Sequence, residues 1–197
     1  MNALPREKSY TYEDLLSWDD GDRYELYDGI PVAMASPSDV HQDVLGEIYW
    51  QIKSYLRGKQ CRVFFAPFDV RLFEKPGDKP GDVDTVVQPD LMVVCDPDKI
   101  DGHGIHGAPD LVVEITSPST RRYDRLLKLD RYMRAGVREY WIVDPAERLV
   151  WVYTLEEDGF YHTATVYSAG SVQPTVPVGI LEGCEIDLTT VFPEGRE

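Results

Sequence analysis

The chain has 197 residues, of which 43% are hydrophobic and 28% are charged, and its formal net charge is −15. This length predicts one domain over residues 1–197 with its own hydrophobic core, and no stretch approaches the ~20 apolar residues of a membrane span or the apolar core of a signal peptide. We therefore expect a cytoplasmic protein without membrane association, and the acidic charge argues against a generic nucleic-acid binder, which is usually basic.

The N-terminal part is expected to begin with a flexible arm over residues 1–9, followed by a short helix that Thr11 can cap. Two short apolar runs, Tyr24–Leu26 and Ile30–Ala35, flank the tripeptide Tyr27-Asp28-Gly29. An Asp-Gly pair between apolar runs is a strong signal for a two-residue hairpin turn. These residues therefore predict an N-terminal β-hairpin.

A long helix is predicted between Ser38, which can cap it, and Gly58, because apolar residues recur there at three- and four-residue spacings. A second helix is expected from Tyr123 to Ala135, and a polar loop over Asp96–Pro109. The segments expected to form strands are Cys61–Phe65, Phe68–Phe73, Asp90–Cys95, Asp110–Thr116, Glu139–Val143, Leu149–Thr154 and Tyr161–Tyr167. The last two would form a C-terminal β-hairpin. This order predicts an α/β (α+β) fold with a three-layer core, in which helices flank a mixed central sheet with antiparallel strands first and a crossover later.

The three cysteines, Cys61, Cys95 and Cys184, lie far apart in the sequence, each in or beside an apolar segment. Their spacing matches neither a disulfide framework nor a zinc site. We therefore expect three buried and reduced thiols.

Two carboxylates occur in an unusual setting for charged residues. Glu114 lies inside the apolar run Asp110–Thr116, and Asp90 begins another apolar strand. A carboxylate in a buried strand is destabilising unless a cation or hydrogen-bond donors meet it. Strand alternation places Glu114 and Thr116 on one face, and Asp90 can approach the same point if the two strands pair. Such oxygen donors suit Mg²⁺ or Mn²⁺ rather than zinc, although Asp90 alone could be a turn residue and Glu114 alone the partner of an arginine.

A site that cleaves phosphodiesters also benefits from a cation near the scissile phosphate, and Lys128 on the second helix is the candidate. Lys128 shares a helix face with Asp124, so it could equally be a surface residue bonded to that carboxylate. The segment Arg121–Arg138 contains seven basic residues against two acidic ones. This helix could hold a DNA backbone although the rest of the chain is acidic, or it could simply present a solvated face.

Several segments are shared, in order, with one protein family. They are Arg23-Tyr24-Glu25-Leu26-Tyr27-Asp28-Gly29, His41, Gln88-Pro89-Asp90, Ala108-Pro109-Asp110-Leu111-Val112-Val113-Glu114, Ser117-Pro118-Ser119-Thr120, Asp124 with Lys128, and Gly136-Val137-Arg138-Glu139-Tyr140-Trp141-Ile142-Val143-Asp144-Pro145. With these segments, which span roughly Tyr10 to Phe192, the chain resembles the Uma family of restriction-endonuclease-like proteins within the PD-(D/E)XK nuclease superfamily.

The resemblance assigns roles to the acidic residues and points to one departure. Pro89-Asp90 stands for the superfamily's PD, and Glu114 stands for its second acid. The superfamily's lysine normally follows two residues after that acid, where this chain has Thr116. Threonine carries no positive charge, so the resemblance implies that Lys128 takes the role of the lysine.

The resemblance also places Glu25 and His41 near the pocket. Glu25 would add a metal ligand or orient a bound water, and His41 would orient a phosphate or carry a proton near neutral pH. Together with Asp90, Glu114 and Lys128, they would form the site of a Mg²⁺-dependent endonuclease, and the resemblance implies that it hydrolyses DNA phosphodiester bonds. A homodimer would suit the cutting of two strands.

Two alternatives stay open. One is a non-catalytic binding or assembly module that retains the nuclease fold, which Thr116 and the acidic surface favour. The other is a hydrolase of a different phosphodiester, such as RNA.

Overall fold

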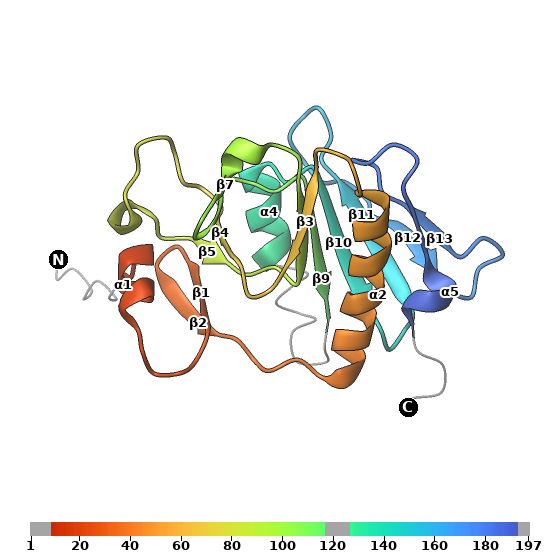
Figure 1. Cartoon of the computed structure of the whole chain (residues 1–197), viewed down its shortest axis with the longest axis horizontal. Helices are drawn as coiled ribbons and strands as arrows, with labels where there is room; N and C mark the ends of the chain where they lie inside the picture. The colour runs from red at the N-terminus through yellow and green to blue at the C-terminus, as the bar shows by residue number, and fades with distance from the viewer. Residues whose placement is uncertain (1–8, 117–126, 193–197) are drawn as a thin grey trace, which may run out of the picture.

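The computed structural model describes residues 9–116 and 127–192, and a six-stranded mixed sheet forms its centre (Figure 1). Across this main sheet the strands are β12 (Thr165–Ser168), β11 (Leu149–Thr154), β10 (Glu139–Asp144), β9 (Leu111–Ile115), β6 (Leu91–Val94) and β3 (Arg62–Phe65). β9 and β10 run parallel, and the other neighbouring pairs run antiparallel. The predicted order, with antiparallel strands first and a crossover later, is confirmed.

A second sheet of six short strands lies beside the main sheet, toward the end of the molecule where the N-terminus lies (Figure 1). Its strands are, in order, β2 (Ile30–Ala33), β1 (Tyr24–Tyr27), β5 (Val86–Val87), β4 (Asp69–Arg71), β8 (Gly104–His106) and β7 (Ile100–Asp101). The segment Asp96–Pro109 predicts a polar loop, whereas the structure forms the β7–β8 hairpin within it. Strands of two or three residues are too short to show an alternating pattern, so only the pairing of β8 with β4 and of β7 with β8 reveals them.

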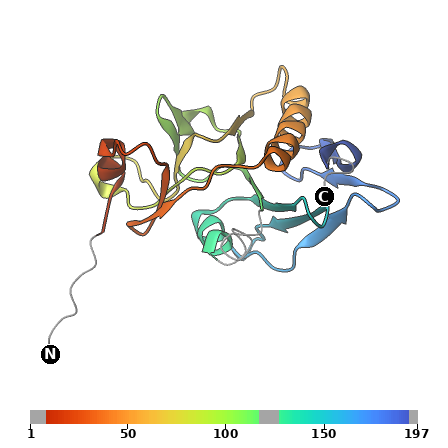
Figure 2. The same ribbon diagram turned by 90° about the horizontal axis from the view of Figure 1, so that it is seen from below.

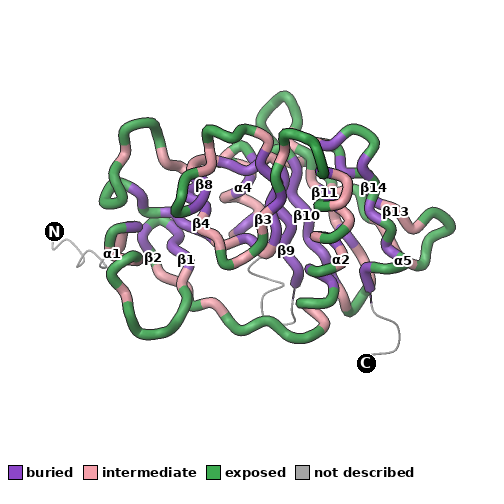
Figure 3. The backbone as a smooth tube through the Cα atoms, in the orientation of Figure 1, coloured by how far each residue is buried: buried purple, intermediate pink, exposed green. Residues whose placement is uncertain are grey.

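Helices and a small sheet cover the two faces of the main sheet. The remaining elements are α1 (Tyr12–Ser17), α2 (Asp39–Tyr55), α4 (Leu129–Ala135), α5 (Leu188–Val191), β13 (Thr175–Pro177), β14 (Glu185–Asp187) and the 3-10 helices η1 (Pro80–Asp82) and η2 (Pro97–Lys99). α2 and α4 lie on opposite sides of the main sheet (Figure 2), and the central strands β6, β9 and β10 are buried throughout (Figure 3). Ile48 packs with Val113 on one face, and Tyr132 packs with Val112 and Ile142 on the other. The three-layer arrangement is confirmed.

Local signals account for the beginning of the chain. At the β1–β2 turn, Asp28 has a φ of 50° and Gly29 a φ of 77°, the left-handed conformations that a two-residue hairpin of this kind needs. A Cβ at Gly29 would also lie 2.0 Å from Ser9 Oγ, so any other residue would have to displace that hydroxyl. Thr11 forms a capping box with the third residue of α1, and Ser38 Oγ accepts a hydrogen bond from the first turn of α2, as predicted.

The second predicted helix is described only in part. α4 runs from Leu129 to Ala135 and ends at Gly136, whose φ of 88° is the left-handed conformation of a helix stop. The expected start at Tyr123 lies outside the described residues, as do residues 1–8 of the expected arm. No helix in the described ranges combines the length and apolar composition needed to cross a membrane.

The cysteine prediction is wrong for two of the three residues. Cys61 and Cys95 form a disulfide bond, because they flank β3 and β6 at adjoining positions of an antiparallel pair. Their separation of 34 residues hid a pairing that depends on the sheet register. Cys184 is a buried free thiol, as expected, and burial raises its pKa to about 11.

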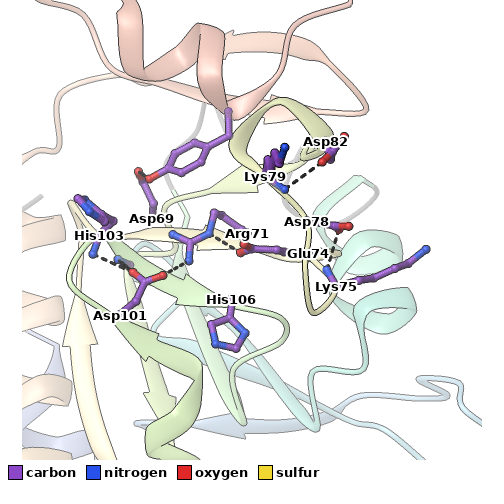
Figure 4. Close-up of polar contacts among 12 residues, drawn as sticks. Asp69, Arg71, Glu74, Lys75, Asp78, Lys79, Asp82, Asp101, His103 and His106 are labelled. Atoms are coloured by element: carbon purple, nitrogen blue, oxygen red, sulfur yellow. Dashed lines mark hydrogen bonds and ion pairs between the residues drawn. The ribbon is translucent and has the colours of Figure 1, made fainter.

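Arg71 on β4 ties the second sheet to its surroundings (Figure 4). Its Nε donates to Glu74 Oε2 at 2.5 Å, and its guanidinium also bonds the Asp101 carboxylate. Burial disfavours the charge, but the two acids outweigh it and raise the pKa of Arg71 above its ordinary value. Tyr12 stacks over this guanidinium at 5.4 Å and donates to Asp69 Oδ2 at 2.9 Å. The network therefore fastens α1 and the β7–β8 hairpin to β4.

Candidate functional site

The pairing of β6 with β9 brings the two predicted acids to one place. Leu91 lies opposite Val113 in this antiparallel pair, so one residue further along the register sets Asp90 opposite Glu114. Directly opposed residues point to the same face of a sheet. Asp90 Oδ2 also accepts a hydrogen bond from the backbone N–H of Ile115 at 2.7 Å. The carboxylate of Asp90 is thereby held against the strand that carries Glu114.

His41 reaches this point from the first turn of α2. Its Nε2 lies 3.1 Å from Asp90 Oδ2, and the two side chains are 15% and 18% exposed. Ser38 fixes the helix start by accepting from the His41 backbone N–H at 3.2 Å. His41 Nδ1 is buried and makes no hydrogen bond with any described residue.

Lys128 meets Glu114 from the other side, at the start of α4. Lys128 Nζ lies 2.9 Å from Glu114 Oε1, and Tyr132 donates to the same oxygen at 2.6 Å. Lys128 and Tyr132 are four residues apart, so they project from one face of the helix. The alternative of a surface lysine is wrong, because Lys128 is buried. Asp124, its partner in that alternative, lies outside the described residues.

Glu25 joins the group from β1 of the second sheet. Its Oε2 lies 3.7 Å from Lys128 Nζ and accepts from the Tyr27 hydroxyl at 2.8 Å. Its Oε1 accepts from the Gln88 backbone N–H at 2.9 Å. The five predicted residues therefore lie in two contacting groups, His41 with Asp90 and Glu25 with Lys128 and Glu114. The hydrogen bond from the Ile115 N–H to Asp90 links the first group to the strand that carries Glu114.

The electrostatics keep the central lysine charged. Burial disfavours the ammonium of Lys128, but the carboxylates of Glu114 and Glu25 outweigh burial and raise its pKa well above the ordinary value. Burial, and then the charge of Glu114, raise the pKa of Tyr132 well above its ordinary value. At neutral pH Lys128 is an ammonium and Tyr132 a phenol, so both act as donors to Glu114.

Thr116 carries no charge and instead makes hydrogen bonds to the neighbouring strand β10. Its Oγ1 donates to Val143 O at 3.2 Å, and its backbone N–H donates to the same carbonyl at 2.8 Å. The cation beside Glu114 thus comes from the helix that follows the strand. Tyr27 and Tyr132 are not among the site residues predicted from the sequence. Tyr27 lies two residues from Glu25 on a strand and Tyr132 lies four residues from Lys128 on a helix, so both spacings place them beside predicted site residues.

The predicted basic helix is not seen as an unpaired positive face in the described part. Arg131 pairs with Asp28 and Asp130, and Arg134 and Arg138 pair with acids at 3.5 and 3.3 Å. Arg134 and Arg138 are nonetheless more than half exposed. The remaining basic residues of the segment, Arg121, Arg122 and Arg125, lie outside the described residues.

The donors at this site suit a hard divalent cation. Asp90 and Glu114 offer carboxylate oxygens from opposed positions, and Glu25 adds a third carboxylate bound to Lys128. Counted with the lysine, these four groups carry a net charge of −2 at neutral pH. The described ranges contain no cluster of three or more His, Cys, Asp or Glu side chains arranged for a metal, so the protein itself would supply few ligands. A small number of protein ligands is compatible with Mg²⁺, because this ion commonly keeps several bound waters and binds one or two carboxylates.

Known proteins resemble the chain over most of its length. The model of the family Uma2, described as "Putative restriction endonuclease", matches residues 11–189. The "Uncharacterized protein slr1290" of Synechocystis sp. is 26% identical over 150 residues, which cover 75% of each chain. The crystal structure of a "putative nuclease belonging to DUF820" from Anabaena variabilis ATCC 29413 has a TM-score of 0.72, covers 92% of this chain and 97% of that one, and is 19% identical. The fold is therefore restriction-endonuclease-like, and the chain belongs to the Uma2 family.

Proposed function

We propose that the protein is a Mg²⁺- or Mn²⁺-dependent endonuclease that hydrolyses DNA phosphodiester bonds with water as the nucleophile. Membership of a family described as restriction endonucleases supports the reaction class. The observation that carries the proposal is the register that sets Asp90 opposite Glu114, beside the Lys128 ammonium, which lies 2.9 Å from Glu114. This ammonium supplies, from α4, the positive charge that Thr116 cannot supply from β9.

Asp90 and Glu114 would hold the metal ion, with water in the remaining positions. When bound, such an ion lowers the pKa of a bound water and neutralises charge on a phosphoryl oxygen. Asp90 is held for this role by the Ile115 N–H, and Glu114 by the Tyr132 hydroxyl.

Lys128 would stabilise the charge that develops on the phosphorane. An ammonium has three donors, and Glu114 and Glu25 hold it in a desolvated place, where its field is stronger than in water. Glu25 in turn is held by Tyr27 and the Gln88 N–H. Glu25 is thus a positioning residue for Lys128.

His41 would carry a proton at the exposed rim of the site. Imidazole is the side chain whose ordinary titration falls near neutral pH, and Nε2 faces Asp90 while Nδ1 has no partner among the described residues. His41 would exchange this proton on the side of the ring that faces Asp90.

DNA is the substrate that the family description favours. The net charge of −15 predicts weak and salt-sensitive binding, because a phosphate chain is repelled by most of the surface. The exposed Arg134 and Arg138 and the basic residues before Lys128 are the proposed contacts. RNA is the competing substrate, which cleavage assays at equal salt would distinguish, and sedimentation would test the proposed homodimer.

The first test is nicking of supercoiled plasmid at low salt with Mn²⁺ or Mg²⁺. Wild type should nick the plasmid, whereas Glu114→Gln should not. The matched control is Glu139→Gln, which alters a buried glutamate on the neighbouring strand β10, bonded to Trp141 Nε1 at 2.6 Å. Equal nicking by wild type and Glu114→Gln would refute the site, and loss of nicking in both variants would point to damage to the fold.

One observation favours a second candidate, a non-catalytic module with a nuclease fold. The Glu114 carboxylate already pairs with the Lys128 ammonium, so its charge is neutralised without a metal ion. Calorimetric titration with Mn²⁺ separates the two functions. Binding that Glu114→Gln abolishes supports the nuclease; no binding at millimolar Mn²⁺, together with no cleavage of DNA or RNA, supports the module.

A further inference from the structure

A pocket of about 530 Å³ lies between the end of α1 and the β1–β2 hairpin. It is lined by Tyr10, Ser17, Trp18, Asp19, Asp20, Tyr24 and Pro31, and we call it the aromatic–acidic pocket. α1 and the hairpin lie at the opposite end of the molecule from β13 and α5 (Figure 1). Tyr24 precedes Glu25 on β1, and alternation turns the two side chains to opposite faces. The pocket is therefore distinct from the candidate site.

Three aromatic rings give this pocket its walls. Trp18 stands between Tyr10, at a centroid distance of 5.2 Å and an angle of 79°, and Tyr24, at 5.0 Å and 80°. Edge-to-face packing fixes neighbouring rings nearly at right angles. All three are partly exposed, so part of each side chain lies at the surface, although Tyr10 and Trp18 also pack against the small core around Leu26. Such rings attract a cation placed over a face.

Carboxylates supply negative charge at the same place. Asp19 and Asp20 are exposed at the pocket. Asp20 is held by the Tyr24 hydroxyl at 2.9 Å and by the Asp22 N–H at 3.1 Å, one bond to each oxygen. Arg23, the one basic residue between positions 10 and 31 in the sequence, is not among the lining residues. The pocket is thus aromatic and anionic together.

This combination selects among ligand classes. An apolar ligand would use the rings and leave the carboxylates against an apolar surface. A metal ion would need oxygens, but both oxygens of Asp20 already accept hydrogen bonds, and the described residues offer no three-ligand cluster. An arginine or lysine side chain uses both features, because its cationic head meets the rings and acids while its alkyl stem lies along an apolar wall such as Pro31.

We infer that the aromatic–acidic pocket binds an arginine or lysine side chain from a basic segment of a partner protein. The chain's net charge of −15 adds long-range attraction for such a partner. This site would recruit the protein to a partner without involving the residues around Glu114.

The test titrates the full chain with a short Gly/Ser peptide that carries one central arginine. The readout is the NMR signal of the Trp18 indole N–H, assigned with Trp18→Phe. The arginine peptide should shift this signal saturably, and the peptide with citrulline, its uncharged isostere, should bind about tenfold more weakly or not at all, a difference of about 1.4 kcal/mol. The double variant Asp19→Asn/Asp20→Asn should lose affinity by a similar factor, since asparagine keeps an oxygen for the Tyr24 hydrogen bond but no charge.

Asp22→Asn is the matched control. It removes one charge two residues from Asp20 without altering a lining side chain, and it should change the affinity by less than about twofold. Three results would each overturn the inference: no shift of the Trp18 signal at about 10 mM peptide, equal binding of the citrulline peptide, or a loss in Asp22→Asn as large as in the double variant.

Discussion

Replacing Lys128 by methionine should destabilise the protein strongly, and more so at high pH than at low pH. Methionine roughly preserves the volume, so the main effect is electrostatic. Glu114 and Glu25 are each 4% exposed, and the substitution leaves both without their buried cation. Removing one partner of a buried ion pair costs about 3–5 kcal/mol, because the other charge stays desolvated.

The pH dependence follows from the pKa values. In wild type the folded-state pKa of Lys128 is raised, so its contribution to stability is fully present below the ordinary lysine value and lost only as pH rises through the higher folded value. In Lys128→Met, the ammonium no longer offsets the desolvation of the two buried carboxylates, and this costs most while they are charged. Protonation at acidic pH removes that charge. The loss should therefore shrink at acidic pH.

Urea unfolding followed by circular dichroism at pH 5 and pH 8 measures this loss. The exposed Lys53 on α2 provides the control, since Lys53→Met should change stability by less than about 0.5 kcal/mol. In a double-mutant cycle, Glu114→Gln should cost less in the Lys128→Met background than in wild type. A loss below about 1 kcal/mol at pH 8, or an equal loss at both pH values, would refute the buried ion pair.

Three other perturbations test separate contacts. Tyr132→Phe removes the hydroxyl that donates to Glu114 at 2.6 Å, so it should lower the free energy of unfolding in urea by about 1.5–3 kcal/mol. It should also weaken Mn²⁺ binding in calorimetry; an unchanged Mn²⁺ affinity would limit Tyr132 to a structural role. The double variant Cys61→Ser/Cys95→Ser opens a cross-link over a separation of 34 residues and should cost about 2–4 kcal/mol, measured against wild type with and without reductant; no difference under oxidising conditions would contradict the bond. Gly29→Ala puts a Cβ 2.0 Å from a serine oxygen at a φ of 77° and should lower stability by about 1 kcal/mol or more, which a thermal melt would detect.

Local and periodic features of the fold could be predicted from the sequence. Ser38 and the helix stripe define α2, and the Asp28-Gly29 turn defines the first hairpin, because these signals act between near neighbours. The alternation of a strand placed Glu114 on the face opposite Val113, which packs with α2 on the other side of the sheet. The three-layer order followed from these elements.

Features that depend on distant pairing could not be predicted in this way. The Cys61–Cys95 bond depends on the register of β3 against β6, and β8 depends on β4 as its partner. The contact of Glu25 with Lys128 needs the second sheet to lie against α4. Resemblance to a family suggested Glu25 for the site, but no pattern within the chain indicates that distance.

The burial of the five residues divides the candidate site into an inner and an outer part. Glu25, Glu114 and Lys128 are almost fully buried, whereas Asp90 and His41 are 18% and 15% exposed. Among these five residues, Asp90 and His41 are therefore the ones that a phosphate or a hydrated cation would meet first. An unpaired charge in the buried inner part would be destabilising, and the Lys128 ammonium prevents this by neutralising the Glu114 carboxylate. The contact between Lys128 and Glu114 thus stabilises the fold without a metal ion, and it also holds an ammonium beside the acid that a metal ion would use. The same contact therefore fits both the nuclease and the non-catalytic module, and metal binding distinguishes the two.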